Sequence, residues 1–139
     1  QLGRNIVTWP AQSEQLTYAL IACKNDLVQN HPEAIGRFLK SISQAEEYTI
    51  DHPSEAKAIV QNSTHNDAAY MASIWPKHQF SISLDKSLVI AMEDEGRWMI
   101  ANNLTTEKTT PDYRDYIYTK GIEEVKPEAV NIIGRSEGQ

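Results

Sequence analysis

The sequence predicts one mainly α-helical domain that begins with two short β-strands. Two β-type apolar runs lie before Asp26, and apolar side chains recur at three- and four-residue steps after it. Three prolines, each followed within two residues by a glutamate, further mark helix starts: Pro32, Pro53 and Pro127. The length of 139 residues suits a single domain. We divide residues 1–139 into strands and a connecting loop (1–26), a helical region (27–133) and a frayed tail (134–139).

The two strands are predicted at residues 6–9 and 17–23. Pro10 ends the first run, and a polar connection separates it from the second. The second run, Leu16–Cys23, is almost continuously apolar, which favours a buried strand but leaves a buried helix as an alternative. We therefore expect Cys23 to be a buried, unreactive thiol.

Proline begins several of the predicted helices. At each of these three starts the proline ring occupies the first helical position, where its missing N–H costs nothing, and the glutamate in the first turn meets the positive end of the helix dipole. We expect Gly36 to mark a close contact between helices. Asp85 is a plausible N-cap. The predicted helices cover about 32–50, 53–62, 67–75, 86–102, a short aromatic segment from Pro111 to Tyr118, 119–125, and a last start at Pro127.

Charge and cysteine content restrict the classes of function. The net charge of −6 disfavours nucleic acid as a partner, since phosphate binding normally needs a basic surface. A single cysteine excludes an intramolecular disulfide framework. His65 and His78 lack the spacing of a zinc site, and His31 and His52 precede prolines at helix starts. We predict neither a metal nor a cofactor.

The sequence offers no assembled catalytic constellation. Glu93, Asp94 and Glu95 are consecutive on a predicted helix, so their side chains point ~100° apart and do not converge on one substrate. Glu95 lies on the apolar stripe, where we expect a cation such as Lys86 or Arg97 to pair with it. A nucleophile-elbow serine and a glycine-rich phosphate loop are absent from the sequence.

The best local candidate for a ligand site is the loop between the two predicted strands. Trp9 offers a flat apolar face, and Gln12 and Ser13 offer uncharged donors and acceptors. The competing interpretation is a plain connection with Trp9 in the core. Since the loop brings no cation, it slightly favours a ligand with an aromatic or neutral portion.

The order of these motifs resembles the C-terminal part of ABC-transporter substrate-binding proteins, in the nitrate/sulfonate/taurine and thiamine-precursor branch. These are type II periplasmic binding proteins. The resemblance extends from about Asn5 to Ile133. The motifs that carry it are Ala22-Cys23-Lys24-Asn25-Asp26, His31-Pro32-Glu33, Arg37-Phe38-Leu39-Lys40, Ala45-Glu46, His52-Pro53-Ser54-Glu55-Ala56, Ser87-Leu88-Val89, Glu93 to Met99, and Val125 to Val130.

The resemblance implies an α/β lobe of a two-lobed, extracytoplasmic receptor, of which this chain would form the C-terminal segment. Such a receptor closes its lobes on a small solute, a nitrate-, sulfonate- or taurine-like anion or a thiamine-precursor pyrimidine. It then delivers the solute to an ABC permease, without chemistry of its own. Two alternatives stay open: a thiamine-pyrimidine synthase-like enzyme of the same fold, and a free-standing helical interaction module. We also expect the chain to form a homo-oligomer through its N-terminal strands and exposed apolar helix surface.

Overall fold

The computed structural model describes residue 7 and residues 17–132, which are mainly helical. Most of the predicted helices are confirmed within a few residues. The short helix α1 is an addition to the predicted helices, the first of which begins at Pro32. The α-helices are α1 (Asn25–Asn30), α2 (Pro32–Asp51), α3 (Pro53–Thr64), α4 (Ala68–Ile74), α5 (Lys86–Ala101) and α6 (Lys120–Val125), and the 3₁₀ turns are η2 (Trp75–Lys77), η3 (Tyr113–Tyr116) and η4 (Pro127–Ala129).

The predicted strand at residues 17–23 is wrong. This segment has no regular secondary structure, and Leu20 and Ile21 are 59% and 65% exposed. A buried strand needs a neighbouring strand for its backbone groups, and no such neighbour exists in residues 17–132. Cys23 is exposed for the same reason, so the expected burial of its thiol is also wrong. Of the predicted strand at 6–9, only Val7 lies within the described residues.

The β-type pairing in residues 17–132 is a single parallel bridge between Leu84 and Val130. The Leu84 amide donates to the Ala129 carbonyl at 2.8 Å, and the Asn131 amide donates to the Leu84 carbonyl at 2.9 Å. This bridge fixes the start of α5 beside the C-terminal segment.

The helix starts follow the predicted chemistry. Pro32 and Pro53 each occupy the first turn of a helix, after the cap residues His31 and His52, whose side chains make no cap hydrogen bond. Asp85 is confirmed as the N-cap of α5, since its carboxylate accepts a hydrogen bond from the Ser87 amide at 2.9 Å.

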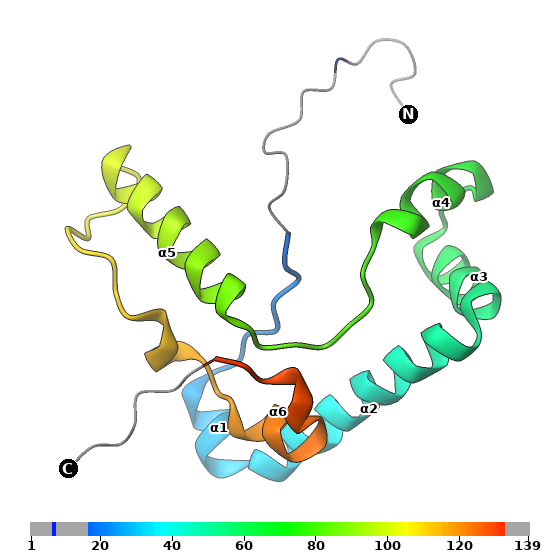
Figure 1. Ribbon diagram of the computed structural model, residues 1–139, viewed down its shortest axis with the longest axis horizontal. Helices are drawn as coiled ribbons and strands as arrows, with labels where there is room; N and C mark the ends of the chain where they lie inside the picture. Colours follow the sequence, from blue (N-terminus) through cyan, green and yellow to red (C-terminus); the bar gives the residue numbers. More distant parts are fainter. Residues whose placement is uncertain (1–6, 8–16, 133–139) are drawn as a thin grey trace.

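The helices form an open arrangement (Figure 1). α2, α3 and α4 follow one another along one curved arm, α5 stands apart on the other side, and α1 and α6 lie at the base. α6 packs closely against α2 at Gly121 of α6. A Cβ atom built on this glycine would lie 2.9 Å from Cδ1 of Leu39 on α2, so a larger residue does not fit there. The expectation of a close helix contact at Gly36 is wrong, because a Cβ atom built on Gly36 meets no neighbouring heavy atom within 4 Å.

Few apolar side chains are buried in this arrangement. In the described part of the chain they are Ala56, Met71, Leu88, Ile122 and Ile132, and they come from five different segments. No helix within residues 17–132 has the length and apolar character needed to cross a lipid bilayer.

Candidate functional site

The predicted ligand-site residues Trp9, Gln12 and Ser13 lie outside the described residues. The segment that follows them is held against α5: the Tyr18 hydroxyl forms a hydrogen bond with the Ser87 hydroxyl, which in turn contacts the Asp85 carboxylate. Tyr18 therefore lies at the N-terminal end of α5.

A groove lies along this same half of α5. It has a volume of about 440 Å³, which falls within the range of small-molecule sites. Four of its residues come from one side of α5, one from η3 and one from the C-terminal segment. They are Lys86, Val89, Ile90, Glu93, Arg114 and Ile132.

The lining combines an apolar floor with charged ends. Val89, Ile90 and Ile132 form the apolar part; Ile132 is buried, while Ile90 is 57% exposed. Lys86 lies at one end of the α5 side and Glu93 at the other, roughly 10 Å apart along the helix at 1.5 Å per residue.

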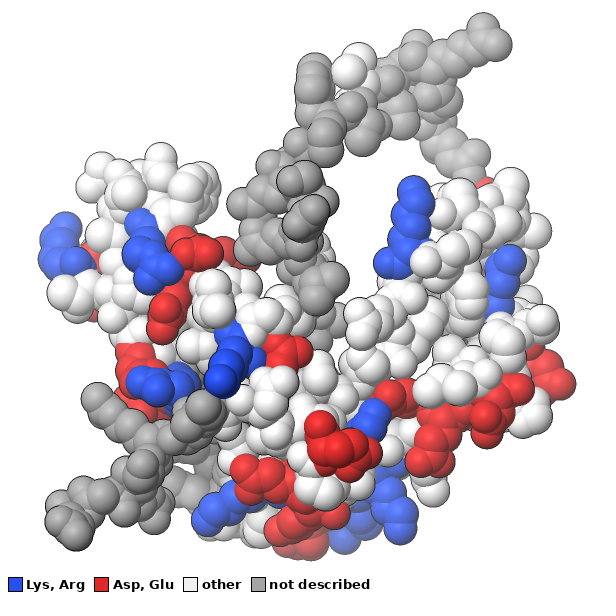
Figure 2. Space-filling view, in the orientation of Figure 1, with Lys and Arg blue, Asp and Glu red and all other residues white. Residues whose placement is uncertain are grey.

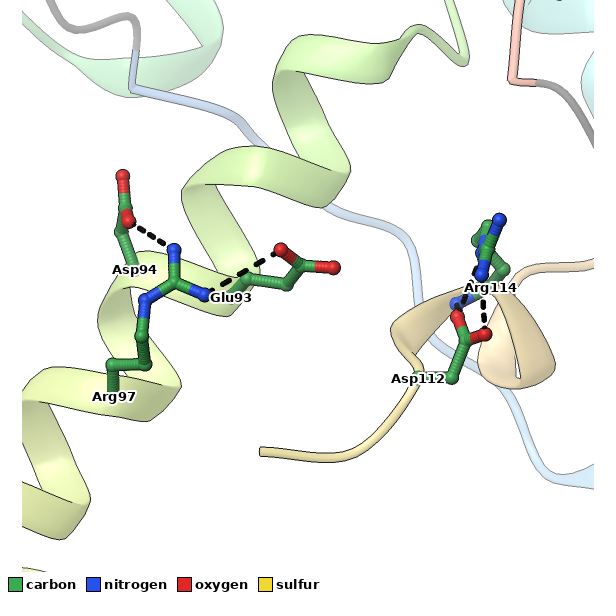
Figure 3. Close-up of polar contacts among 5 residues, drawn as sticks. All are labelled: Glu93, Asp94, Arg97, Asp112 and Arg114. Atoms are coloured by element: carbon green, nitrogen blue, oxygen red, sulfur yellow. Dashed lines mark hydrogen bonds and ion pairs between the residues drawn. The ribbon is translucent and has the colours of Figure 1, made fainter. Parts of the chain in front are cut away.

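The arginine of the groove is held by a neighbouring carboxylate (Figure 3). Arg114 Nε donates to Asp112 Oδ1 at 2.8 Å, and Arg114 Nη2 donates to Asp112 Oδ2 at 2.6 Å. The hydrogen bond with Asp112 and then its charge raise the pKa of the Arg114 guanidinium above its usual value. Because a guanidinium has five N–H donors, this bidentate pair leaves Arg114 with further donors for a ligand.

Glu93 belongs to a second set of ion pairs, on α5 itself (Figure 3). Arg97 lies 3.5 Å from Glu93 and 2.5 Å from Asp94. The hydrogen bond with Asp94 is the main reason that the pKa of Arg97 is raised. The expected pairing of Glu95 with Arg97 is therefore wrong: Glu95 is exposed, and Arg97 binds the two preceding carboxylates.

Lys86 forms no ion pair with any residue that the structure describes, although its backbone amide donates to Asn131 Oδ1 at 3.0 Å. Its ammonium is thus available to a ligand in the groove. Within residues 17–132, no three His, Cys, Asp or Glu side chains gather to hold a metal ion. The arrangement can bind a small molecule through apolar contact and charge pairing.

Sequence reasoning did not find this groove. The signal on α5 is visible in retrospect, because Lys86, Val89, Ile90 and Glu93 recur at the i, i+3, i+4 and i+7 spacing of one helix side. The contributions of Arg114 and Ile132 depend on how η3 and the C-terminal segment fold back onto α5.

Residues 5–56 match a family model described as NMT1/THI5 like. This segment contains the predicted ligand loop, α1, α2 and the start of α3, and it supports the resemblance to nitrate, sulfonate and thiamine-precursor binding proteins there. The groove on α5 lies beyond the match. No curated protein and no solved structure matches the chain.

Proposed function

We propose that this chain is part of an extracytoplasmic receptor that binds a small solute and delivers it to an ABC permease. The observation that carries the proposal is the NMT1/THI5-like match over residues 5–56. The ordered His-Pro-Glu and Pro-Ser-Glu-Ala helix starts fall inside that match, and both begin helices in the structure.

The solute of this proposal is a small anion of the nitrate, sulfonate or taurine kind, or a thiamine-precursor pyrimidine. Trp9, Gln12 and Ser13 are the proposed contacts. An indole face with uncharged donors and acceptors suits a flat, neutral heterocycle better than a bare anion. The pyrimidine is therefore the preferred solute.

The protein acts in this proposal by binding alone, and a synthase-like enzyme of the same fold is the rival. The two differ in what happens to the solute. A receptor returns the pyrimidine unchanged after binding, whereas a synthase forms a pyrimidine from other compounds.

An uptake experiment tests the proposal in cells. Cells from which the gene is deleted should lose accumulation of labelled pyrimidine, and the gene carrying Trp9→Ala should restore it poorly. The protein should also be released with the extracytoplasmic fraction. Unchanged uptake of pyrimidine, nitrate and taurine in the deletion, or recovery of the protein in the cytosol, would overturn the receptor proposal.

A further inference from the structure

The groove along α5 is separate from the loop on which the proposed solute contacts lie. Its lining residues come from α5, η3 and the C-terminal segment, so all of them lie beyond the NMT1/THI5-like match at residues 5–56. The match therefore gives no information on what the groove binds. Its ligand has to be inferred from the charge and polarity of the lining side chains.

Two of the three charged side chains in the groove already have a partner of opposite charge. Arg114 holds Asp112 through two hydrogen bonds, and Glu93 lies 3.5 Å from Arg97. The Glu93 carboxylate projects from α5 toward the side of Arg114 (Figure 3), and its charge contributes to the raised pKa of Arg114. Glu93 and Arg114 therefore form a polar end of the groove in which the charges nearly cancel.

Lys86 lies at the other end, and its ammonium forms no ion pair with any residue that the structure describes. The nearest carboxylate in sequence, that of Asp85, accepts hydrogen bonds from the amide and the hydroxyl of Ser87 instead. Lys86 is also the first residue of α5, where the positive end of the helix dipole makes a cation unfavourable. Because an anion interacts favourably with both the ammonium and the dipole, this end of the groove favours a negatively charged group.

The middle of the groove is aliphatic. Val89, Ile90 and Ile132 line it, and none of the described residues of the lining is aromatic. A flat ring has no stacking partner there, whereas an aliphatic chain removes the exposed surface of these side chains from water. From Lys86 to Glu93 the helix rises by roughly 10 Å, which is close to the length of an extended octanoate chain.

The charges elsewhere on the protein do not keep an anion away from Lys86. On the face that Figure 2 shows, acidic side chains gather along α2 and α3, whereas Lys and Arg are mixed with acidic side chains over α5. Repulsion by carboxylates is screened beyond about 8 Å at physiological salt. The net charge of −6 therefore acts only weakly at the groove.

We propose that the groove on α5 binds an unbranched aliphatic monocarboxylate. The carboxylate of this ligand pairs with Lys86, and its chain lies on the three aliphatic side chains of the middle part. A second carboxylate at the far end is disfavoured, because it meets the carboxylate of Glu93. The site does not depend on the proposed function, which rests on a different part of the chain.

Titration of the full chain with octanoate, followed through the amide NMR signals, tests the proposal. Saturable shifts should concentrate at Val89, Ile90 and Ile132. The dissociation constant should fall about twofold or more for each methylene added from butanoate to octanoate, since each buried methylene contributes to binding. Absence of saturable binding, or shifts spread equally over the exposed apolar side chains of α2 and α3, would overturn the proposal.

Lys86→Gln tests the contact with the carboxylate. This variant should weaken octanoate binding about threefold to fivefold, as expected for the loss of an exposed ion pair. The matched control is Lys120→Gln, since Lys120 is also exposed and is also the first residue of an α-helix, α6. Equal octanoate affinity in the two variants would contradict the pairing with Lys86.

Octanedioate tests the orientation of the chain without relying on how any variant folds. It has the chain length of octanoate and a second carboxylate at the far end. Wild-type protein should bind it about threefold or more weakly than octanoate, and Glu93→Gln should reduce this difference, because like charges repel. Octanedioate that binds wild type as tightly as octanoate would overturn the placement of the chain between Lys86 and Glu93.

Discussion

Glu46 on α2 and Lys126 after α6 form an ion pair, with 2.6 Å between Glu46 Oε1 and Lys126 Nζ. The second oxygen of the same carboxylate accepts the backbone amide of Ile82 at 3.2 Å. One side chain therefore joins three segments that are far apart in sequence. Both partners are well covered, because 9% of the Glu46 side chain and 24% of the Lys126 side chain are exposed.

Removing one member of this pair should destabilise the fold. Lys126→Met leaves a nearly buried carboxylate without its cation, so we expect the free energy of unfolding to fall by about 1–3 kcal/mol. Urea unfolding monitored by circular dichroism measures the change. Arg97→Met is the control, since its exposed pairs should contribute only about 0–1 kcal/mol. Equal losses in the two variants would show that Glu46 is not a structural junction.

Two glycines in helices should respond in opposite ways to the same substitution. Gly121→Ala places a Cβ 2.9 Å from Leu39 Cδ1 and 3.2 Å from Tyr118 Cε1, so we expect a loss of about 1–3 kcal/mol from overpacking. Gly36→Ala meets no atom within 4 Å and should gain up to about 1 kcal/mol from helix propensity. Thermal unfolding of both variants measures the difference. A stabilised Gly121→Ala protein would contradict the packing of α6 on α2.

The cap of α5 should make stability depend on acid pH. The Ser87 hydroxyl hydrogen bond is the main reason that the pKa of Asp85 is lowered from 3.8. Because the folded pKa is the lower one, this stabilisation is present above 3.8 and is lost as the pH falls through the folded pKa. The difference in unfolding free energy between wild type and Asp85→Asn should therefore shrink as the pH falls below 3.8.

Ser87→Ala provides the control for this pH dependence. Without the hydroxyl, the folded pKa of Asp85 should rise toward 3.8, so the acid loss of stability should become smaller and be complete at a higher pH. Identical pH profiles for wild type and Ser87→Ala would exclude the Ser87 hydrogen bond as the cause.

The thiol of Cys23 should react readily in the folded protein. Cys23 is exposed, so an aromatic disulfide reagent should modify it at a rate close to that of the unfolded chain. Absorbance of the released thiolate follows the reaction. Strong protection of Cys23 under native conditions would instead favour the buried strand that the sequence predicts.

Local rules explain what could be predicted from the sequence. Pro32, Pro53 and Asp85 act through their own backbone positions and their nearest neighbours, so the helix starts follow from the residue order. The error at Leu20 and Ile21 has a different origin. An apolar run indicates that a segment needs cover, but burial also requires a partner, which a local pattern does not specify.

Contacts between residues that are far apart in sequence could not be predicted either. Tyr113 packs on Gly96 across a loop, and Glu46 and Lys126 lie 80 residues apart, so neither contact has a local signature. The groove depends on similar long-range placement of Arg114 and Ile132 against α5. The loop of Trp9 could be predicted as a candidate because its residue types are consecutive, and it remains a prediction.

Calorimetric titration of the protein with a thiamine-precursor pyrimidine, and in parallel with nitrate and taurine, is the most direct test of the proposed receptor function. We expect saturable binding of the pyrimidine that Trp9→Ala weakens about tenfold or more, as for loss of an aromatic contact of about 1.4 kcal/mol. Trp98→Ala should leave the pyrimidine affinity unchanged. Absence of binding to all three solutes, or tight nitrate binding that Trp9→Ala does not diminish, would contradict the account.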